Sequence, residues 1–284
     1  MKPEQPSRTA LAAAAARAAH LIVDDAPPIF ADSLALSLLG GLADKILDRH
    51  RAHGSHVALW GTRALATARS RYTEDRLAAA VQRGIRQYVI LGAGLDSFGY
   101  RSELVGDVAV FEVDHPATQQ WKRRLLSGAR ITVPGAVTFT PVDFEADSLV
   151  DRLVASGFSL SEPALVSWLG VTMYLTGAAL GQTLAQLGGF APGTELVANY
   201  MLPVSMQDEL ARSYSGVVMP AAARRGEPWL TLLSPGDMTA LLERHGFGEV
   251  RHINQHDTVG SGLWQRTDLL RPLNLSNLAH ATVI

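Results

Sequence analysis

Short apolar runs alternate with amphipathic stretches through the middle of the chain. The apolar runs are rich in β-branched residues, which predicts buried strands at 87–92, 108–114, 137–143, 164–169 and 194–200. Apolar residues at helical spacing predict helices at 115–128, 145–156, 176–190 and 235–246. Strands that alternate with helices indicate an α/β fold, in which a doubly wound, mostly parallel sheet is covered by helices on both faces.

The first eighty residues predict helices and no strand. An alanine-rich stretch at 8–23 has Ser7 as its N-cap, and leucines at helical spacing extend over 30–50. A third helix is expected over 62–82, after a break at 54–61. Because this block precedes the first strand, we expect it to pack over the ligand crevice as an N-terminal helical cap.

The first predicted strand ends on a glycine turn, Gly92-Ala93-Gly94, which lets the backbone approach a ligand closely. Twenty residues past Gly94, the second predicted strand ends on Asp114. In a doubly wound sheet these two strand ends lie side by side, so the carboxylate can accept from both ribose hydroxyls of a nucleoside. The layout therefore predicts nucleoside binding.

The spacing around this turn favours S-adenosylmethionine (SAM) over a dinucleotide. A dinucleotide fingerprint requires glycines in the pattern G-x-G-x-x-G, and Ser97 stands at the third glycine position. Asp96 would repel a diphosphate, whereas it is tolerated beside the ammonium group of SAM. Asp96 is therefore a cofactor-binding candidate together with Gly92, Gly94 and Asp114.

Two further stretches offer cofactor contacts, each with a structural alternative. Asp143, at the end of the third strand, can accept from the adenine amino group or can cap the next helix, and Phe144 supplies an apolar wall. Taken with the other strand ends, the adenine role is the better hypothesis. Arg69 can fork onto the carboxylate of an amino-acid-type cofactor, but a solvated helix arginine is the simpler explanation, and Arg71 competes for the role.

The end of the fourth predicted strand, from Gly170 to Tyr174, lies where a methyl acceptor must meet the cofactor. Gly170 is a cofactor-binding candidate at that point. Tyr174, and Tyr200 at the end of the fifth strand, can orient the acceptor or can be core aromatics. His115 directly precedes a proline at a helix start, which favours a capping role over a general base. No catalytic residue is identified.

The composition excludes several classes of protein. The 284 residues are 47% hydrophobic and 18% charged, which is typical of a globular chain, and the formal net charge of −2 shows no basic footprint for nucleic acid. The absence of cysteine excludes thiolate metal sites, and no histidine pair has ligand spacing, so no metal is predicted. The uncharged stretch 163–194 holds six glycines and two prolines, which argues against a membrane span. We expect a cytoplasmic monomer or homodimer with no membrane partner.

We expect a single domain over 1–284 with four parts. These are the helical cap at 1–84, the SAM-binding core at 85–200, an insertion at 201–234, and a C-terminal helix with antiparallel strands at 235–284. The part of the insertion at 202–230 is either a substrate cover or an irregular helical connection. Apolar runs at 249–254 and 279–284 predict a hairpin-like antiparallel pair that closes a seven-stranded sheet.

Six stretches carry a resemblance to a known family: Ala68–Arg71, Leu91–Arg101, Phe111–Pro116, Val142–Phe144, Gly170–Leu175 and Ala191–Tyr200. In these stretches the sequence resembles the leucine carboxyl methyltransferase family, on an actinobacterial branch of SAM-dependent O-methyltransferases that includes polyketide-tailoring enzymes. The specific similarity covers about 69–200, and a looser one reaches the N-terminal block. The resemblance implies a class I SAM-dependent methyltransferase fold, Rossmann-like, with an N-terminal helical cap.

The resemblance also implies roles for single residues. It implies that Arg69 holds the methionine carboxylate, with Arg17 as a loose N-terminal candidate for the same group. It implies that the glycine turn passes under the amino-acid part, that Asp114 binds the ribose, and that the Asp143–Phe144 pair holds adenine. Many relatives have a glutamate where this chain has Leu169, so the protein-phosphatase substrate of the namesake enzyme is not carried over.

The leading hypothesis is an O-methyltransferase that uses SAM and a small, largely apolar acceptor, in secondary metabolism. A carboxylate acceptor is already a nucleophile, and no convincing base is found, which favours a carboxylic acid or a phenolic hydroxyl. The missing glutamate motivates a second hypothesis, a non-catalytic SAM-fold subunit. A third, an NAD-dependent oxidoreductase, is disfavoured by Asp96 and Ser97.

Overall fold

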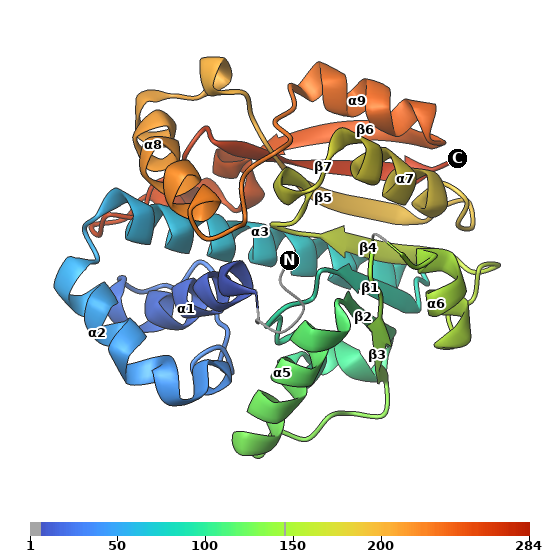
Figure 1. The fold of residues 1–284 in the computed structure, drawn as a ribbon, viewed down its shortest axis with the longest axis horizontal. Coiled ribbons are helices and arrows are strands. Elements are labelled where there is room, and N and C mark those ends of the chain that lie inside the picture. The colour runs from blue at the N-terminus through green and yellow to red at the C-terminus, as the bar shows by residue number, and fades with distance from the viewer. Residues whose placement is uncertain (1–6, 145) are drawn as a thin grey trace.

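The computed structural model describes residues 7–144 and 146–284, and its centre is a seven-stranded sheet in the order β3-β2-β1-β4-β5-β7-β6 (Figure 1). The strands are β1 (Gln87–Leu91), β2 (Ala109–Asp114), β3 (Val137–Pro141), β4 (Ala164–Trp168), β5 (Glu195–Met201), β6 (Phe247–Asn254) and β7 (Ser276–Val283). The first five pair in parallel, and β7 lies antiparallel between β5 and β6. The predicted mostly parallel sheet is thus confirmed. The antiparallel pair also forms, but a long connection, 255–275, replaces the expected hairpin-like turn.

The central strands are buried on both faces because their side chains alternate between two cores. In β1, Val89 and Leu91 face one core together with the apolar residues of α6 (Leu149–Ala155), α7 (Gly177–Leu187) and α9 (Pro235–Arg244). Tyr88 and Ile90 face the opposite core with Leu77 of α3 (Val57–Gln82). This two-sided burial explains why the strands read as continuous apolar runs in the sequence.

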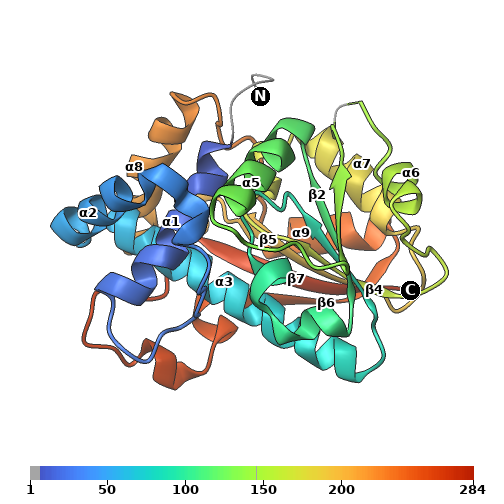
Figure 2. The ribbon, with the colours of Figure 1, turned by 90° about the horizontal axis from the view of Figure 1, so that it is seen from below.

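The N-terminal block forms the expected helical cap. It contains α1 (Arg8–Val23), a 3₁₀ turn (Ser37–Leu42), α2 (Ala43–His53) and α3. The Ser7 hydroxyl accepts from Ala10 N at 3.1 Å, which confirms the predicted N-cap. Figures 1 and 2 show α1 and α2 beside the same end of the sheet as α8 (Glu209–Ala223).

Two cap predictions are wrong in detail. No continuous helix covers 30–50, because Asp32 accepts from the backbone N–H groups of Leu34 and Ala35, and Gly40 takes a φ of +54°. The predicted break at 54–61 is shorter than expected, because α3 already begins at Val57. Gly61 lies inside α3, where a Cβ would stand only 2.6 Å from the Tyr214 ring on α8.

The helices α5 (Pro116–Gly128), α6, α7 and α9 follow the predicted order. The short helix α4 (Phe98–Arg101), directly after the glycine turn, was not predicted. Residue 145, the start of the predicted helix 145–156, lies outside the described residues, and α6 begins at Leu149. Within 202–230 the structure places the fifteen-residue α8, which contains Pro220. No helix in the described ranges is long and apolar enough to cross a membrane.

Candidate functional site

The glycine turn lies at the carboxyl end of β1 and has room for no side chain. Gly92 has a φ of +68° and Gly94 a φ of +48°, conformations that favour glycine. A Cβ on Gly92 would stand 2.4 Å from Val171 Cγ2, and one on Gly94 would stand 2.8 Å from Ala10 Cβ on α1. The turn is therefore packed between the fourth-strand loop and the first cap helix.

Asp114 joins the turn to the end of β2. Its Oδ2 accepts from Gly94 N at 2.6 Å, and its Oδ1 accepts from His115 N at 2.7 Å. Burial raises the pKa of this carboxyl, and the two backbone N–H donors oppose that shift. His115 Nδ1 in turn accepts from Ala117 N at 3.2 Å, so the expected capping role of His115 is confirmed.

Arg69 places a guanidinium at the end of β4. A Cβ on Gly170 would lie 2.7 Å from both Nη1 and Nη2 of Arg69, so the glycine is what allows the guanidinium to come this close. Burial, together with the neighbouring charge of Arg17, lowers the pKa of Arg69 to about 10, so the group stays charged at neutral pH. Within the described part of the chain no carboxylate lies within 4.0 Å of its nitrogens. Its competitor Arg71 is instead exposed and pairs with Asp75 at 2.8 Å.

A second arginine, Arg17, ties the cap to the glycine turn. It donates to Asp32 Oδ2 at 2.8 Å and to the Leu95 carbonyl at 2.7 Å. Burial alone would raise the pKa of Asp32, but Arg17, Ser97 and Arg101 outweigh burial and hold that pKa below its usual value. Arg17 is therefore already neutralised by protein, whereas Arg69 is not.

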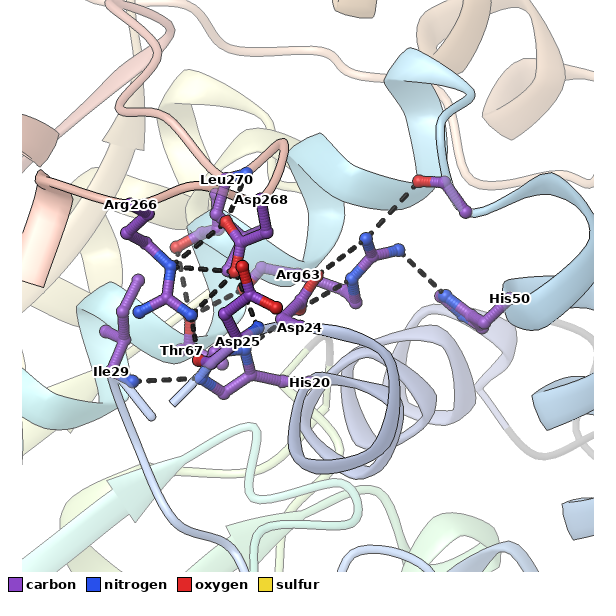
Figure 3. Close-up of polar contacts among 12 residues, drawn as sticks. His20, Asp24, Asp25, Ile29, His50, Arg63, Thr67, Arg266, Asp268 and Leu270 are labelled. Carbon is purple, nitrogen blue, oxygen red and sulfur yellow. Dashed lines mark hydrogen bonds and ion pairs between the residues drawn. The ribbon is translucent and has the colours of Figure 1, made fainter. Parts of the chain in front are cut away.

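Asp24, at the C-terminal end of α1, fixes the other end of the cap helix (Figure 3). It accepts from Arg63 Nε at 2.8 Å and Nη2 at 2.9 Å, and it contacts His20 Nδ1 at 2.9 Å. His20 Nε2 accepts from Ile29 N at 2.9 Å, and Arg63 Nη1 lies 3.2 Å from His50 Nδ1. These contacts bind α1, α2 and α3 to one another, so both ends of α1 are held in place beside the turn.

The predicted adenine side is less tightly defined. Phe144 packs against the core formed with α6 and α7 and lines a hollow of about 410 Å³ between those helices. Asp143 is part-buried, and its backbone N–H donates to Asp147 Oδ2 at 2.9 Å. The alternative that Asp143 caps the next helix is wrong, because Ser148 is the N-cap of α6. Asp96 accepts from Phe98 N at 2.8 Å, directly after the glycine turn.

The two candidate tyrosines lie in different places. Tyr174 is part-buried after β4, where burial raises its pKa to about 12 despite the opposing effects of Trp229 and Arg69. Tyr200 is 1% exposed in the core with α7 and α9, and its hydroxyl contacts His252 Nδ1 at 2.8 Å. This placement favours the core-aromatic alternative for Tyr200, because the pleat of β5 turns its side chain toward the core.

The segment after α8 crosses the ends of two strands. Leu230 N donates to the Met173 carbonyl at 2.7 Å, and Leu233 N donates to the Met201 carbonyl at 2.9 Å. Trp229 packs with Tyr174 on the apolar cluster beneath α8. The C-terminal part of the insertion thus covers the carboxyl ends of β4 and β5.

Sequence reasoning missed two residues of the site. Asn199 on β5 accepts from Arg69 Nη1 at 3.2 Å, across 130 residues of sequence. Asp32 accepts from Arg17 Nε at 2.8 Å and so organises the cap around that arginine. Asn199 lies within a stretch that carries the family resemblance, but no local pattern gives either residue a partner, so only the fold shows their contacts.

Comparisons with known proteins agree with this geometry. The family model described as leucine carboxyl methyltransferase matches residues 10–188. A Bacillus subtilis protein named "Putative S-adenosyl-L-methionine-dependent methyltransferase YktD" is 30% identical over 99% of this chain and 99% of its own. A Mycobacterium tuberculosis protein with the same description is 32% identical over 69% of this chain and 65% of its own.

Two solved structures show the same fold at low sequence identity. A Thermobifida fusca "putative methyltransferase" is 16% identical, covers 98% of this chain and 95% of its own, and has a TM-score of 0.61. A protein of the DUF574 family from Streptomyces avermitilis is also 16% identical, with 94% and 96% covered and a TM-score of 0.56. The predicted class I methyltransferase fold is thus confirmed, and the chain belongs to the leucine carboxyl methyltransferase family.

Proposed function

We propose that this protein transfers the methyl group of SAM to an oxygen atom of a small, largely apolar acceptor, either a carboxylic acid or a phenol. The observation that carries the proposal is the Arg69 guanidinium, which has no carboxylate within 4.0 Å among the described residues, near a glycine turn and the Asp114 carboxylate. Membership of the family and the description of its relatives support SAM as the methyl donor.

The chemistry of the residues fits SAM. Arg69 is a part-buried cation with no carboxylate within 4.0 Å in the described part of the chain, which is costly unless an anion binds it, and SAM carries a carboxylate. Asp114 is an acceptor at the end of β2, as a ribose requires, and the two glycines leave the turn free of side chains. Asp96 lies after the turn, where it would repel a diphosphate but attract an ammonium group.

Each residue then has a defined task. Arg69 orients the carboxylate end, Gly92 and Gly94 let the backbone approach the amino-acid part, and Asp114 fixes the ribose. Asp143 and Phe144 are the proposed adenine contacts, and Gly170 makes room for the guanidinium of Arg69. When bound, SAM supplies a methyl group on an already activated sulfonium.

The protein's own contribution is alignment of the reactants and exclusion of water. The cap helix α1 and the segment after α8 lie over the strand ends that would face the reacting groups. Alignment of two reactants can supply about 7–11 kcal/mol of the barrier in favourable cases. A transfer of this kind needs no protein acid, because the sulfonium is already a good leaving group.

The acceptor class follows from the groups near the end of β4. Tyr174 has a pKa of about 12, so its hydroxyl stays protonated at neutral pH and can donate a hydrogen bond but cannot remove a proton. Leu169 supplies no carboxylate at the end of β4. An acceptor that ionises by itself is therefore favoured over an aliphatic alcohol. The assignment to secondary metabolism rests on the resemblance alone.

The test is a screen with methyl-labelled SAM against apolar carboxylic acids, phenols of graded acidity and aliphatic alcohols. We expect turnover of acids or acidic phenols, with a rate that follows the ionised fraction of the acceptor. Turnover of aliphatic alcohols alone would refute the acceptor class. Binding of SAM without turnover of any acceptor would support the non-catalytic alternative.

A further inference from the structure

The partner of Arg69 distinguishes it from three other arginines whose side chains are buried. Arg17, Arg63 and Arg266 each pair with an aspartate at 2.7–2.8 Å. Arg69 instead donates from Nη1 to the carboxamide Oδ1 of Asn199 at 3.2 Å. A neutral partner fixes the direction of a guanidinium but leaves its charge in place.

The orientation of the Asn199 carboxamide is set by its second contact. Its Nδ2 donates to the Asn277 carbonyl on β7 at 3.2 Å, so Oδ1 is the atom that faces Arg69. Asn199 is 3% exposed, and its own carbonyl accepts from the Thr172 hydroxyl at 2.6 Å. The side chain therefore has one orientation that satisfies both of its ends.

The surroundings of this contact are neutral as well. A cavity of about 10 Å³ is lined by Arg69, Asn199, Gln255 and Asn277, among others, and such a volume holds one water molecule. The cavity is flanked by a buried donor, Gln255 Nε2, and a buried acceptor, Asn277 Oδ1, neither of which has a hydrogen-bond partner among the described residues. Apart from Arg69 itself, the residues that line this cavity carry no charge, so nothing on this side neutralises the guanidinium.

We propose that Asn199 is a positioning residue for cofactor binding: its neutral carboxamide directs the Arg69 guanidinium toward Gly170 without cancelling its charge. This inference rests on the proposed function, in which Arg69 binds the carboxylate of SAM. The charge is thereby kept for the ligand. An aspartate at position 199 would be nearly the same size but would neutralise Arg69 and compete with that carboxylate.

The test compares two ligands by calorimetry: S-adenosylhomocysteine (SAH), which has the carboxylate, and 5′-methylthioadenosine, which lacks the amino-acid part. We expect Asn199→Asp to weaken SAH binding about tenfold or more and to leave methylthioadenosine binding within about twofold. Asn274→Asp, the same change at an exposed position, should alter neither. A purely structural role of Asn199 would weaken both ligands equally, and that result would overturn the proposal, as would unchanged SAH binding.

Arg69→Met separates this inference from the proposed function. If Arg69→Met weakens SAH but Asn199→Asp does not, only the role of Asn199 is wrong. If Arg69→Met binds SAH like the wild type, both fail together, because Asn199 acts through Arg69. Should Asn199→Asp not fold, Asn199→Ala serves instead: loss of Oδ1 should weaken SAH about threefold or more and spare methylthioadenosine, and an equal effect on both would overturn the proposal.

Discussion

Gly170→Ala tests whether the space beside Gly170 controls the position of Arg69. Gly170 has a φ of +72°, so any side chain adds about 1–2 kcal/mol of backbone strain. Its Cβ would also stand 2.7 Å from Nη1 and Nη2, well inside van der Waals contact, and the flexible arginine is the group that moves. A guanidinium displaced by several tenths of an ångström loses charge-assisted hydrogen bonds to a carboxylate, each worth about 1.5–3 kcal/mol.

The matched control is Gly193→Ala. Gly193 has a φ of +86°, but a Cβ there would meet only Pro163 Cβ, at 3.9 Å. Both variants should lose about 1–2 kcal/mol of unfolding free energy, a decrease in Tm of a few degrees. Calorimetric titration with SAH should show at least a roughly tenfold loss of affinity in Gly170→Ala alone.

The comparison of the two alanine variants has a clear refuting result. If Gly170→Ala and Gly193→Ala bind SAH equally well, the Arg69 guanidinium does not need the space over Gly170. The same conclusion follows if Gly170→Ala weakens SAH and methylthioadenosine to the same extent, because that loss would not involve the carboxylate.

Three further predictions concern the cap and the acceptor side. Asp24→Asn should lower the unfolding free energy by about 3–5 kcal/mol, because it leaves Arg63 buried without its carboxylate partner. Asp75→Asn, at an exposed ion pair, should lower it by less than about 1 kcal/mol. A similar loss for both variants in urea titrations would contradict this prediction. Burial and Arg63 lower the pKa of His50 in the folded protein to about 4, whereas in the unfolded chain it has its usual value of 6.5. As the pH falls below 6.5, the unfolded chain therefore takes up a proton on His50 before the folded protein does. Unfolding free energy should therefore fall by up to about 3 kcal/mol between pH 6.5 and 4, and His50→Gln should flatten the profile; an unchanged profile would refute the shift. Tyr174→Phe should retain SAH affinity and lower kcat with the acceptor, and a loss of SAH affinity would instead assign Tyr174 to the cofactor.

Local patterns in the sequence predicted the sheet and the glycine turn. β1 is an apolar run, and Gly92 and Gly94 follow it almost directly, so residues close together in the sequence are enough to predict both the strand and the turn. The helix predicted over 30–50 failed because Asp32 is a buried partner of Arg17, and a leucine pattern does not show this contact. The helix α8 was not predicted outright because Pro220 lies within it.

The other features of the site could not be predicted because they depend on contacts between segments that are far apart in the sequence. Arg69 and Asn199 are 130 residues apart and meet only after β5 pairs with its neighbours. Tyr200 follows Asn199 directly, yet the pleat places it on the opposite face, where it contacts His252. Two adjacent residues of one strand thus face opposite sides of the sheet, one toward the site and the other toward the core. Knowing only that a residue is near a strand end does not tell which side it faces.

The most direct test of the central claim is a calorimetric titration of the wild type, Asp114→Ala and Asp75→Ala with SAM, SAH and NADH. The wild type should bind SAM and SAH and should not bind NADH comparably. Asp114→Ala should weaken SAM by about 1.5–3 kcal/mol, roughly tenfold to over a hundredfold, while the exposed Asp75→Ala variant should match the wild type. If the wild type binds neither SAM nor SAH, or if Asp114→Ala binds SAM unchanged, this crevice is not the cofactor site.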